Sequence, residues 1–311
     1  MPASPYVELH AHSGFSFLDG ASHPEELVLT AKELGYPALA LTDHNGLYGS
    51  MEFAQAAKEA GIQPVTGAEV SVDPRTVPGL EGYGLDLRPV GTIRDQRDAG
   101  LRHRDAGLYP LPADHELVAP DMGFHLTLLA ETPEGYANLC RLLTQSHMEA
   151  EDRRNPLLPF PALMDPERVR GLILLTGCRR SPLWTALRDS AATGEALLRQ
   201  MLDAFGPWNV FVELQENSVK GDRDRNRRLA RLADRFVVPV VATGNVHYHR
   251  PERYRLQDVL ASIRNRTTLD NAHPVRRANG LFYLASAQEM THRFRGRLDA
   301  ISNTLRIAQR S

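Results

Sequence analysis

The stretch PALALTDHNG, residues 37–46, joins a short apolar run directly to an acid, a histidine and a glycine turn. Apolar runs of this length between turn residues are typical of buried strands. Polar residues at such a strand end are typical of α/β folds, because the carboxyl ends of the strands form the rim where chemistry takes place. ELHAH, residues 8–12, repeats the pattern with two histidines one residue apart. These stretches predict a functional site built at strand ends.

Apolar runs alternate with stretches of helical spacing along most of the chain. We expect strands at residues 6–9, 37–42, 63–72, 124–130, 171–177, 209–215 and 238–248. We expect helices at residues 24–35, 49–61, 135–150, 182–204, 222–236, 254–264 and 286–310. Because the runs are apolar on both faces and rich in β-branched residues, the strands are expected to pair in parallel. Seven strands alternating with helices predict an α/β protein with a closed barrel.

Two regions break this rhythm. Residues 73–122 are rich in proline, glycine and charge and show no sustained period, which predicts a long flexible insertion that adds nothing to the core. After residue 250 the patterns are helical and strand character is weak. We therefore expect a barrel domain over 1–250 and a helical C-terminal extension over 251–311, packed on the barrel.

The composition is that of a globular protein, with 311 residues, 42% of them hydrophobic and 24% charged. There is no run of 18 apolar residues and no apolar leader, so we expect a cytoplasmic protein without a membrane partner. The chain contains two cysteines, Cys140 and Cys178, so a disulfide framework is not expected. Acidic residues predominate before residue 150 and basic residues after 250, which fits a cation site and a phosphate-bearing partner, or equally two solvated faces.

Side chains that could bind a metal lie at the expected strand ends. They are His10, His12, Asp43, His44, Glu69, His125, Cys178, Asn245 and His247. Side chains alternate along an extended chain, so the H-x-H spacing puts His10 and His12 on one face. A lone histidine is more often structural than a ligand, whereas donors at several strand ends together indicate a shared metal site.

Ordered motifs give the chain a family resemblance. They are ELHAHS (8–13), FLDGA (17–21), LTDHNGLYG (41–49), GAEV (67–70), HLTLLA (125–130) with GYANL (135–139), LLTGC (174–178) and ATGNVHY (242–248). From about residue 5 to the C-terminus, the chain resembles the PHP (polymerase and histidinol phosphatase) domain. The likeness is closest to the PHP domain that opens the alpha subunit of bacterial DNA polymerase III, in its error-prone branch.

The resemblance implies a distorted (β/α)7 barrel with two or three divalent metal ions at its rim. The ligands that it implies are His10, His12, Asp19, His44, Glu69, His125, Cys178, Asn245 and His247. The resemblance assigns catalysis to His10, His12, Asp19, His44 and Glu69. Asn245 departs from the family, which usually has an aspartate there, and a neutral amide is a weaker ligand than a carboxylate. We therefore expect incomplete occupancy of the metal site that Asn245 serves.

The residue types agree with this chemistry. Mixed imidazole and carboxylate ligands suit Mn, Fe or Zn ions, and a Cys178 thiolate favours Zn or Fe. Such ions bring the pKa of a shared water toward 7 and neutralise the charge that develops on a phosphate during in-line attack. Asp43 is expected to orient the neighbouring His44 imidazole, and a role as a turn or capping residue is equally compatible with its position.

The favoured function is a metal-dependent phosphoesterase, in particular a 3′–5′ exonuclease acting on single-stranded DNA or 3′ ends. One alternative is a metal-stabilised platform that holds polymerase domains or replication and repair proteins without catalysis. A second alternative is a small-molecule phosphatase of the histidinol phosphate type. The chain ends before the palm, fingers and thumb of a polymerase would begin, so we expect no polymerase activity from it.

Several arginines are candidates for contacts with phosphate or DNA. The candidates are Arg179, Arg180, Arg223 and Arg225, and the helix expected over 222–236 is rich in arginine. An Arg-rich helix is more often a solvated outer helix than a DNA-binding one. Interleaved aromatic residues are not evident, so base-specific recognition is not expected.

Overall fold

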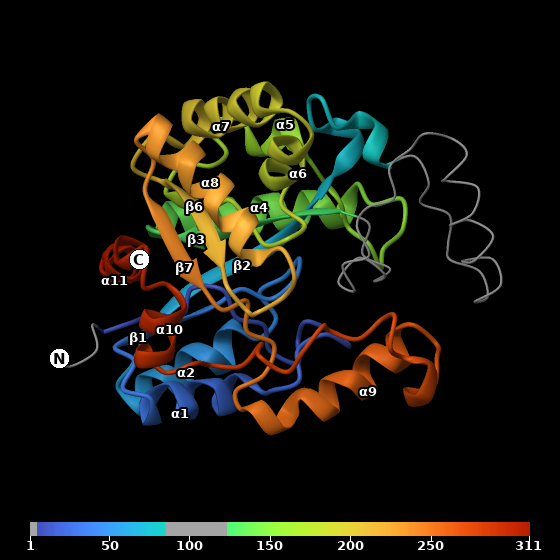
Figure 1. The fold of residues 1–311 in the computed structure, drawn as a ribbon, viewed down its shortest axis with the longest axis vertical. Helices are drawn as coiled ribbons and strands as arrows, with labels where there is room; N and C mark the ends of the chain where they lie inside the picture. Colours follow the sequence, from blue (N-terminus) through green and yellow to red (C-terminus); the bar gives the residue numbers. More distant parts are fainter. Residues whose placement is uncertain (1–4, 85–122) are drawn as a thin grey trace.

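The sheet at the centre of the fold has seven strands, in the order β1-β2-β3-β5-β6-β7, with β4 paired to β2 (Figure 1). They are β1 (Ala38–Leu41), β2 (Gln63–Asp73), β3 (Phe124–Ala130), β4 (Leu158–Pro159), β5 (Leu172–Leu175), β6 (Val210–Gln215) and β7 (Val240–Thr243). The structure is a computed structural model that describes residues 5–84 and 123–311. Apart from the two-residue β4, the strands lie within or close to the ranges expected from the sequence.

The segment 8–12 joins the two edges of this sheet. Glu8 forms a parallel bridge with Leu39 of β1, and Ala11 forms one with Val246, just after β7. Backbone hydrogen bonds reinforce both bridges. The Ala40 amide donates to the Glu8 carbonyl at 2.9 Å, and the Val246 amide donates to the His10 carbonyl at 2.9 Å. The expected strand at 6–9 is therefore replaced by isolated bridges. The expectation of a distorted α/β barrel is confirmed.

The expectation that all strands run in parallel is wrong for β3. It pairs antiparallel with β2 on one side and with β5 on the other, whereas β1, β2, β5, β6 and β7 run in parallel. An apolar run buried on both faces has the same composition in either direction, so the sequence does not reveal its orientation. The reversal places the first residues of β3 at the rim formed by the carboxyl ends of its neighbours.

Helices surround the curled sheet (Figure 1). They include α1 (Pro24–Glu33), α2 (Ser50–Ala60), α4 (Pro133–Met148), α5 (Phe160–Leu163), α6 (Pro182–Asp189), α7 (Ala191–Phe205), α8 (Asp222–Phe236), α9 (Tyr254–Arg264), α10 (Ala287–Arg293) and α11 (Leu298–Ala308). Two expected helices are each divided. Ser190 adopts an extended φ of −151° and caps α7 through a hydrogen bond from Thr193 N, which separates α6 from α7. Residues 294–297 separate α10 from α11.

The start of the expected insertion contributes to the core. Val77 and Leu80 are fully buried in the main hydrophobic cluster, and short 3₁₀ helices cover Pro74–Thr76 and Glu81–Gly84. The prediction that residues 73–122 add nothing to the core is therefore wrong for 73–84. Two isolated apolar residues in a stretch rich in proline, glycine and charge do not form a pattern that predicts burial. Residues 85–122 lie outside the described residues.

The C-terminal segment packs directly on the barrel. Helix α11 lies against β7 (Figure 1). Ile307 and Ala308 are buried in the cluster that includes Phe211 of β6. The Val7 amide donates to the Thr304 hydroxyl at 3.2 Å, so α11 also holds the residue that precedes the bridging segment 8–12. The division at residue 250 stays a prediction. In the described part of the chain, every helix is too short or too polar to cross a membrane.

Gly177 shows how tightly the loops at the rim are packed. Its φ is +92°, and a Cβ at this position would lie 2.0 Å from the carbonyl oxygen of His125. We expect Gly177→Ala to lower the free energy of unfolding by at least about 3 kcal/mol, because backbone strain and a backbone clash add. Urea unfolding followed by circular dichroism measures the change.

Gly61 provides a matched control for that substitution. Its φ is +72°, and a Cβ would meet no atom within 4 Å. Gly61→Ala is therefore expected to cost about 1 kcal/mol from backbone strain alone. Equal losses in the two variants would contradict the close contact at Gly177.

Candidate metal centre

The candidate ligands reach one rim of the barrel from separate segments. His10 and His12 lie on the bridging segment, His44 follows β1, Glu69 lies on β2, and His125 begins β3. Cys178 follows β5, Asn245 and His247 follow β7, and Asp19 lies on the loop after the bridging segment. His125 faces the same rim because β3 is antiparallel to its neighbours. The chain reversal thus completes the set that the sequence predicted for parallel strands.

Glu69 is the point on which four imidazoles converge. Its Oε1 lies 3.2 Å from His10 Nε2 and 3.1 Å from His125 Nδ1. Its Oε2 lies 3.2 Å from His44 Nε2 and 3.5 Å from His12 Nε2. The Glu69 side chain is 2% exposed, so water cannot solvate this carboxylate freely. One carboxylate therefore contacts imidazoles on two sides.

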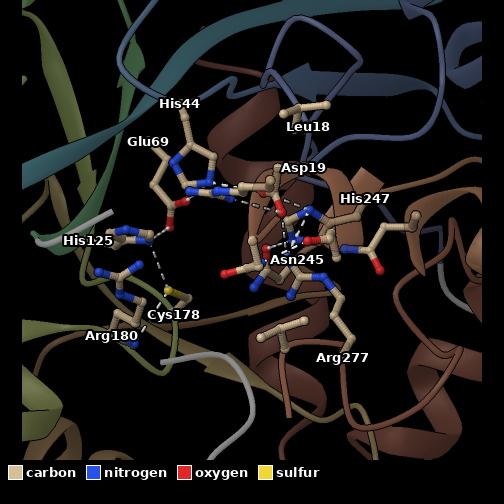
Figure 2. Close-up of a pocket in the computed structure, with 15 residues that line it drawn as sticks. Leu18, Asp19, His44, Glu69, His125, Cys178, Arg180, Asn245, His247 and Arg277 are labelled. Carbon is tan, nitrogen blue, oxygen red and sulfur yellow. Dashed lines mark hydrogen bonds and ion pairs between the residues drawn. The ribbon is translucent and has the colours of Figure 1, made fainter. Parts of the chain in front are cut away.

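Two donor groups meet the spacing required for a metal ion. His10, His12 and Glu69 form one group, and His44, Glu69 and His125 form the other, with donor atoms within 4.8 Å of one another in each. Cys178 Sγ lies 3.5 Å from His125 Nδ1, beside the second group (Figure 2). Glu69 belongs to both groups, which is the position of a ligand shared by two neighbouring ions.

Unsatisfied polar atoms in these groups support a cation as the missing partner. Among the described residues, His10 Nε2, His12 Nε2 and Glu69 Oε1 are buried, and their short contacts with one another lack the geometry of hydrogen bonds. Buried polar atoms without hydrogen bonds are costly and uncommon in proteins. Imidazole nitrogens and a carboxylate oxygen are good ligands for Zn, Mn or Fe ions, so the residues present fit the implied metals.

Electrostatics within the cluster favour its ligand forms at two positions. Burial lowers the pKa of His12 well below its ordinary value, and the neighbouring His44 and His247 lower it further, so this imidazole is neutral. Burial raises the pKa of Glu69, but His125, His44 and His10 outweigh that effect and hold the pKa well below its usual range. A neutral imidazole and an ionised carboxylate are the forms that bind metal ions.

His10 is fixed from behind by Glu213, which lies on β6. His10 Nδ1 is 2.7 Å from Glu213 Oε1, and Thr243 and Gln215 also donate to that carboxylate oxygen. Burial lowers the pKa of His10, but Glu213 and Glu69 outweigh it and raise the pKa well above its ordinary value. With Nδ1 directed at Glu213, Nε2 is the nitrogen that faces Glu69. Carboxylates behind metal-binding histidines commonly set the ring orientation in this way.

His247 lies on the side of the centre that carries Asp19 and Asn245. His247 Nε2 is 3.0 Å from Asn245 Oδ1, and His247 Nδ1 is 3.2 Å from Asp19 Oδ2. Burial and then the Arg277 guanidinium lower the pKa of His247 to about 4, although Asp19 raises it. Asp19 also approaches His44 Nε2 at 3.3 Å, so it links this side of the centre to the Glu69 cluster.

Asp43 is buried and organises the loop that carries Asp19. One of its oxygens accepts from Ser13 N at 2.7 Å and from the Ser16 hydroxyl at 2.6 Å, and the other accepts from the Ser13 hydroxyl at 2.7 Å. The Ser16 hydroxyl in turn accepts from His44 N at 3.1 Å. Asp43 thus orders the loop through Ser13 and Ser16, and Ser16 in turn holds the backbone amide of His44. None of these hydrogen bonds reaches the His44 ring.

The arginine candidates lie in different places. Arg180 lines the same pocket as the candidate ligands, on the side of His125 and Cys178 (Figure 2). Arg179 pairs with Asp222 at 2.6 Å, and Arg225 is buried and donates to the Gln215 carbonyl at 2.7 Å. Arg223 is exposed on α8. Arg180 is therefore placed to meet a ligand in the pocket, while Arg179 and Arg225 hold the start of α8.

Sequence reasoning missed three charged residues of this region. Glu213 lies behind His10, and Arg264 and Arg277 line the pocket from the C-terminal extension. A lone glutamate within the apolar run NVFVELQ, residues 209–215, was a usable signal for the first. The two arginines lie in a generally basic tail, which offers no comparable signal.

The chain is similar to several known proteins. Residues 8–217 match the PHP domain family. Over 325 residues the chain is 39% identical to an error-prone DNA polymerase of Nocardia farcinica, with 99% of this chain and 27% of that protein covered. It is 30% identical over 315 residues to the DNA polymerase III subunit alpha of Treponema pallidum, with 100% and 23% covered. A solved amidohydrolase from Chromobacterium violaceum matches with a TM-score of 0.38 and 22% identity, over 78% of this chain and 88% of that chain.

The chain belongs to the PHP domain family, as its motifs indicated. Within the family, its relatives over nearly its whole length include error-prone DNA polymerases and a DNA polymerase III alpha subunit. The chain spans about a quarter of the length of these curated relatives.

Glu213→Gln tests the support behind His10. The exchange keeps the size of the side chain and removes its charge, so the ring is held less firmly and its Nε2 becomes a weaker ligand. We expect the Kd for Zn²⁺, measured by competition with a chelator, to rise by about 10- to 100-fold. Glu59→Gln, on the exposed face of α2, is the control. An unchanged Kd in Glu213→Gln would show that His10 needs no such support.

Proposed function

We propose that this chain is a metal-dependent phosphoesterase, and in particular a 3′–5′ exonuclease that hydrolyses DNA phosphodiester bonds. The observation that carries the proposal is the convergence of four imidazoles on the buried carboxylate of Glu69. One cation would be held by His10, His12 and Glu69, and another by His44, Glu69 and His125, with Cys178 close by. Mn, Zn or Fe ions fit these donors.

Divalent cations in such a cluster supply a water of lowered pKa and neutralise the charge of a phosphate group. The chain's own residues would bind and orient the substrate. Arg180 and Arg264 line the pocket from different segments and are suited to contact the non-bridging oxygens of a phosphodiester. Glu69, shared by the two donor groups, would keep their separation fixed.

The relatives favour DNA as the substrate. Proteins similar over nearly the whole of this chain are named error-prone DNA polymerases. A hydrolase of DNA ends that lies beside a polymerase would act on the strand that the polymerase extends. Polymerase domains and replication or repair proteins are therefore the proposed partners. The cytoplasmic location expected from the sequence is part of this proposal.

Incubation with end-labelled DNA tests the activity. The protein loaded with Mn²⁺ is given 5′-labelled single-stranded DNA, 5′-labelled duplex DNA, or a chromogenic phosphate monoester, and each reaction is repeated in EDTA. Stepwise shortening of the labelled strand that EDTA abolishes is the expected result. Hydrolysis of the monoester with DNA left intact would instead indicate a small-molecule phosphatase. Inertness toward all three substrates, in a protein that nevertheless binds metal, would favour the structural platform.

A further inference from the structure

Arg277 lies between residues that the family resemblance assigns to a metal site. Its Nη2 is 3.3 Å from Asp19 Oδ1 and 3.0 Å from His247 Nδ1 (Figure 2). Among the described residues, the donor groups with the spacing for a metal ion are those around Glu69, and Asp19 and His247 belong to neither. The guanidinium thus has the place between two ligands that a cation would take.

We propose that the Arg277 guanidinium replaces a third cation, so that the centre holds two metal ions around Glu69 and none between Asp19 and His247. This inference rests on the proposed function, because it assumes that the donors around Glu69 bind metal. It departs from the three-ion centre that the resemblance allows, and it assigns a role to a residue beyond the 8–217 segment matched to the family.

The atoms of His247 and Asn245 that could bind a metal ion already have polar partners in the protein. His247 Nδ1 lies 3.0 Å from Arg277 Nη2, which can only donate, and 3.2 Å from Asp19 Oδ2, which as a carboxylate can only accept, so this nitrogen has a partner whichever tautomer the ring adopts. His247 Nε2 lies 3.0 Å from Asn245 Oδ1. Both ring nitrogens and the amide oxygen of Asn245 are occupied in this arrangement. A cation would therefore have to displace one of these partners to bind His247.

Two guanidinium groups face a single carboxylate on this side. With Asn245 in place of the usual aspartate, Asp19 supplies a single negative charge between the two strand ends. Arg264 Nη1 lies 3.7 Å from Asp19 Oδ1 and adds a second positive charge. A divalent cation placed here would therefore meet net repulsion.

The position of Arg277 is built into the fold. Its guanidinium lies 4.7 Å from the centroid of the Phe282 ring, over the ring face. The Phe282 carbonyl accepts from His247 N at 2.8 Å, and Tyr248 forms a parallel bridge with Tyr283. The segment that carries Arg277 is thus paired with the strand end that carries His247. The Arg277 side chain is 14% exposed, which agrees with a fixed position.

Counting and locating bound zinc tests the inference without measuring activity. The wild type, Arg277→Met/Asn245→Asp and Arg276→Met are each saturated with Zn²⁺ alone. Metal per chain is measured in solution, and anomalous difference maps at the zinc edge locate the ions in crystals. Arg276→Met is the matched control, because Arg276 comes from the same segment and pairs with Asp258 at 3.3 Å.

We expect two zinc ions in the wild type and in Arg276→Met, both beside Glu69. We expect three in the double variant, with the new ion between Asp19 and position 245. A third ion in the wild type overturns the inference and leaves the proposed function standing. Two ions in a correctly folded double variant also overturn it. Absence of zinc beside Glu69 in the wild type overturns the proposed function and the inference together, and this count does not depend on whether the variant folds.

Discussion

Glu69→Gln is expected to lower the rate of metal-dependent phosphodiester hydrolysis by at least about 1000-fold, or about 4 kcal/mol of transition-state stabilisation. The exchange keeps the shape of the side chain and replaces a carboxylate that contacts four imidazoles with a neutral amide. Both donor groups lose their shared anionic ligand, so bound zinc per chain is expected to fall with the rate. Gel analysis of labelled DNA and metal analysis of the same sample measure the two effects.

Glu59→Gln is the control for this exchange. Glu59 is exposed on α2 and accepts a hydrogen bond from Gln55 at 3.2 Å, so its substitution changes the charge of the protein by the same amount. We expect its hydrolysis rate and metal content to equal those of the wild type. Retention of activity and of both metal ions in Glu69→Gln would show that Glu69 is not the shared ligand.

The double variant His10→Ala/His12→Ala is expected to lose one metal ion per chain and all detectable hydrolysis. Both imidazoles belong to the same donor group, and their Nε2 atoms make no hydrogen bond among the described residues. Removing them leaves Glu69 as the remaining ligand of that group. The second group, with His44 and His125, keeps its ligands and is expected to bind its ion more weakly. Metal analysis together with the labelled DNA assay measures the outcome.

His292→Ala separates this effect from a general effect of removing imidazoles. His292 is exposed on α10, and the variant is expected to match the wild type in metal content and activity. Circular dichroism and thermal unfolding show whether the double variant keeps its fold. Full metal content in a folded His10→Ala/His12→Ala protein would place the ions elsewhere.

The convergence of the candidate ligands could be anticipated from the sequence better than the path of the chain. An H-x-H pair on an extended segment and an Asp-His pair after an apolar run are local patterns, and local geometry determines where such side chains point. The direction of β3 is a tertiary property, because a buried apolar strand fits its neighbours either way. His125 was expected near the strand at 124–130 and at the rim, although a parallel strand would have put its first residues at the opposite edge of the sheet; the reversed direction of β3 accounts for its position.

Residues that act behind the ligands were harder to predict. Glu213 contacts His10 across 203 positions of sequence, and Arg277 contacts Asp19 across 258. Neither contact leaves a periodic or spaced pattern in the sequence, since each depends on how distant segments pack. Similarly, Val77 and Leu80 enter the core from a stretch whose composition suggests a loop. Long-range packing, which composition does not encode residue by residue, accounts for all three cases.

X-ray absorption at the zinc edge of the Zn²⁺-loaded wild type tests the central claim most directly. The claim is that segments far apart in the sequence bring imidazoles together around Glu69 to hold metal ions. It predicts nitrogen and oxygen ligands at about 2.0–2.1 Å and scattering from about two imidazoles per zinc ion. A spectrum with an oxygen shell alone and no imidazole scattering would contradict the account.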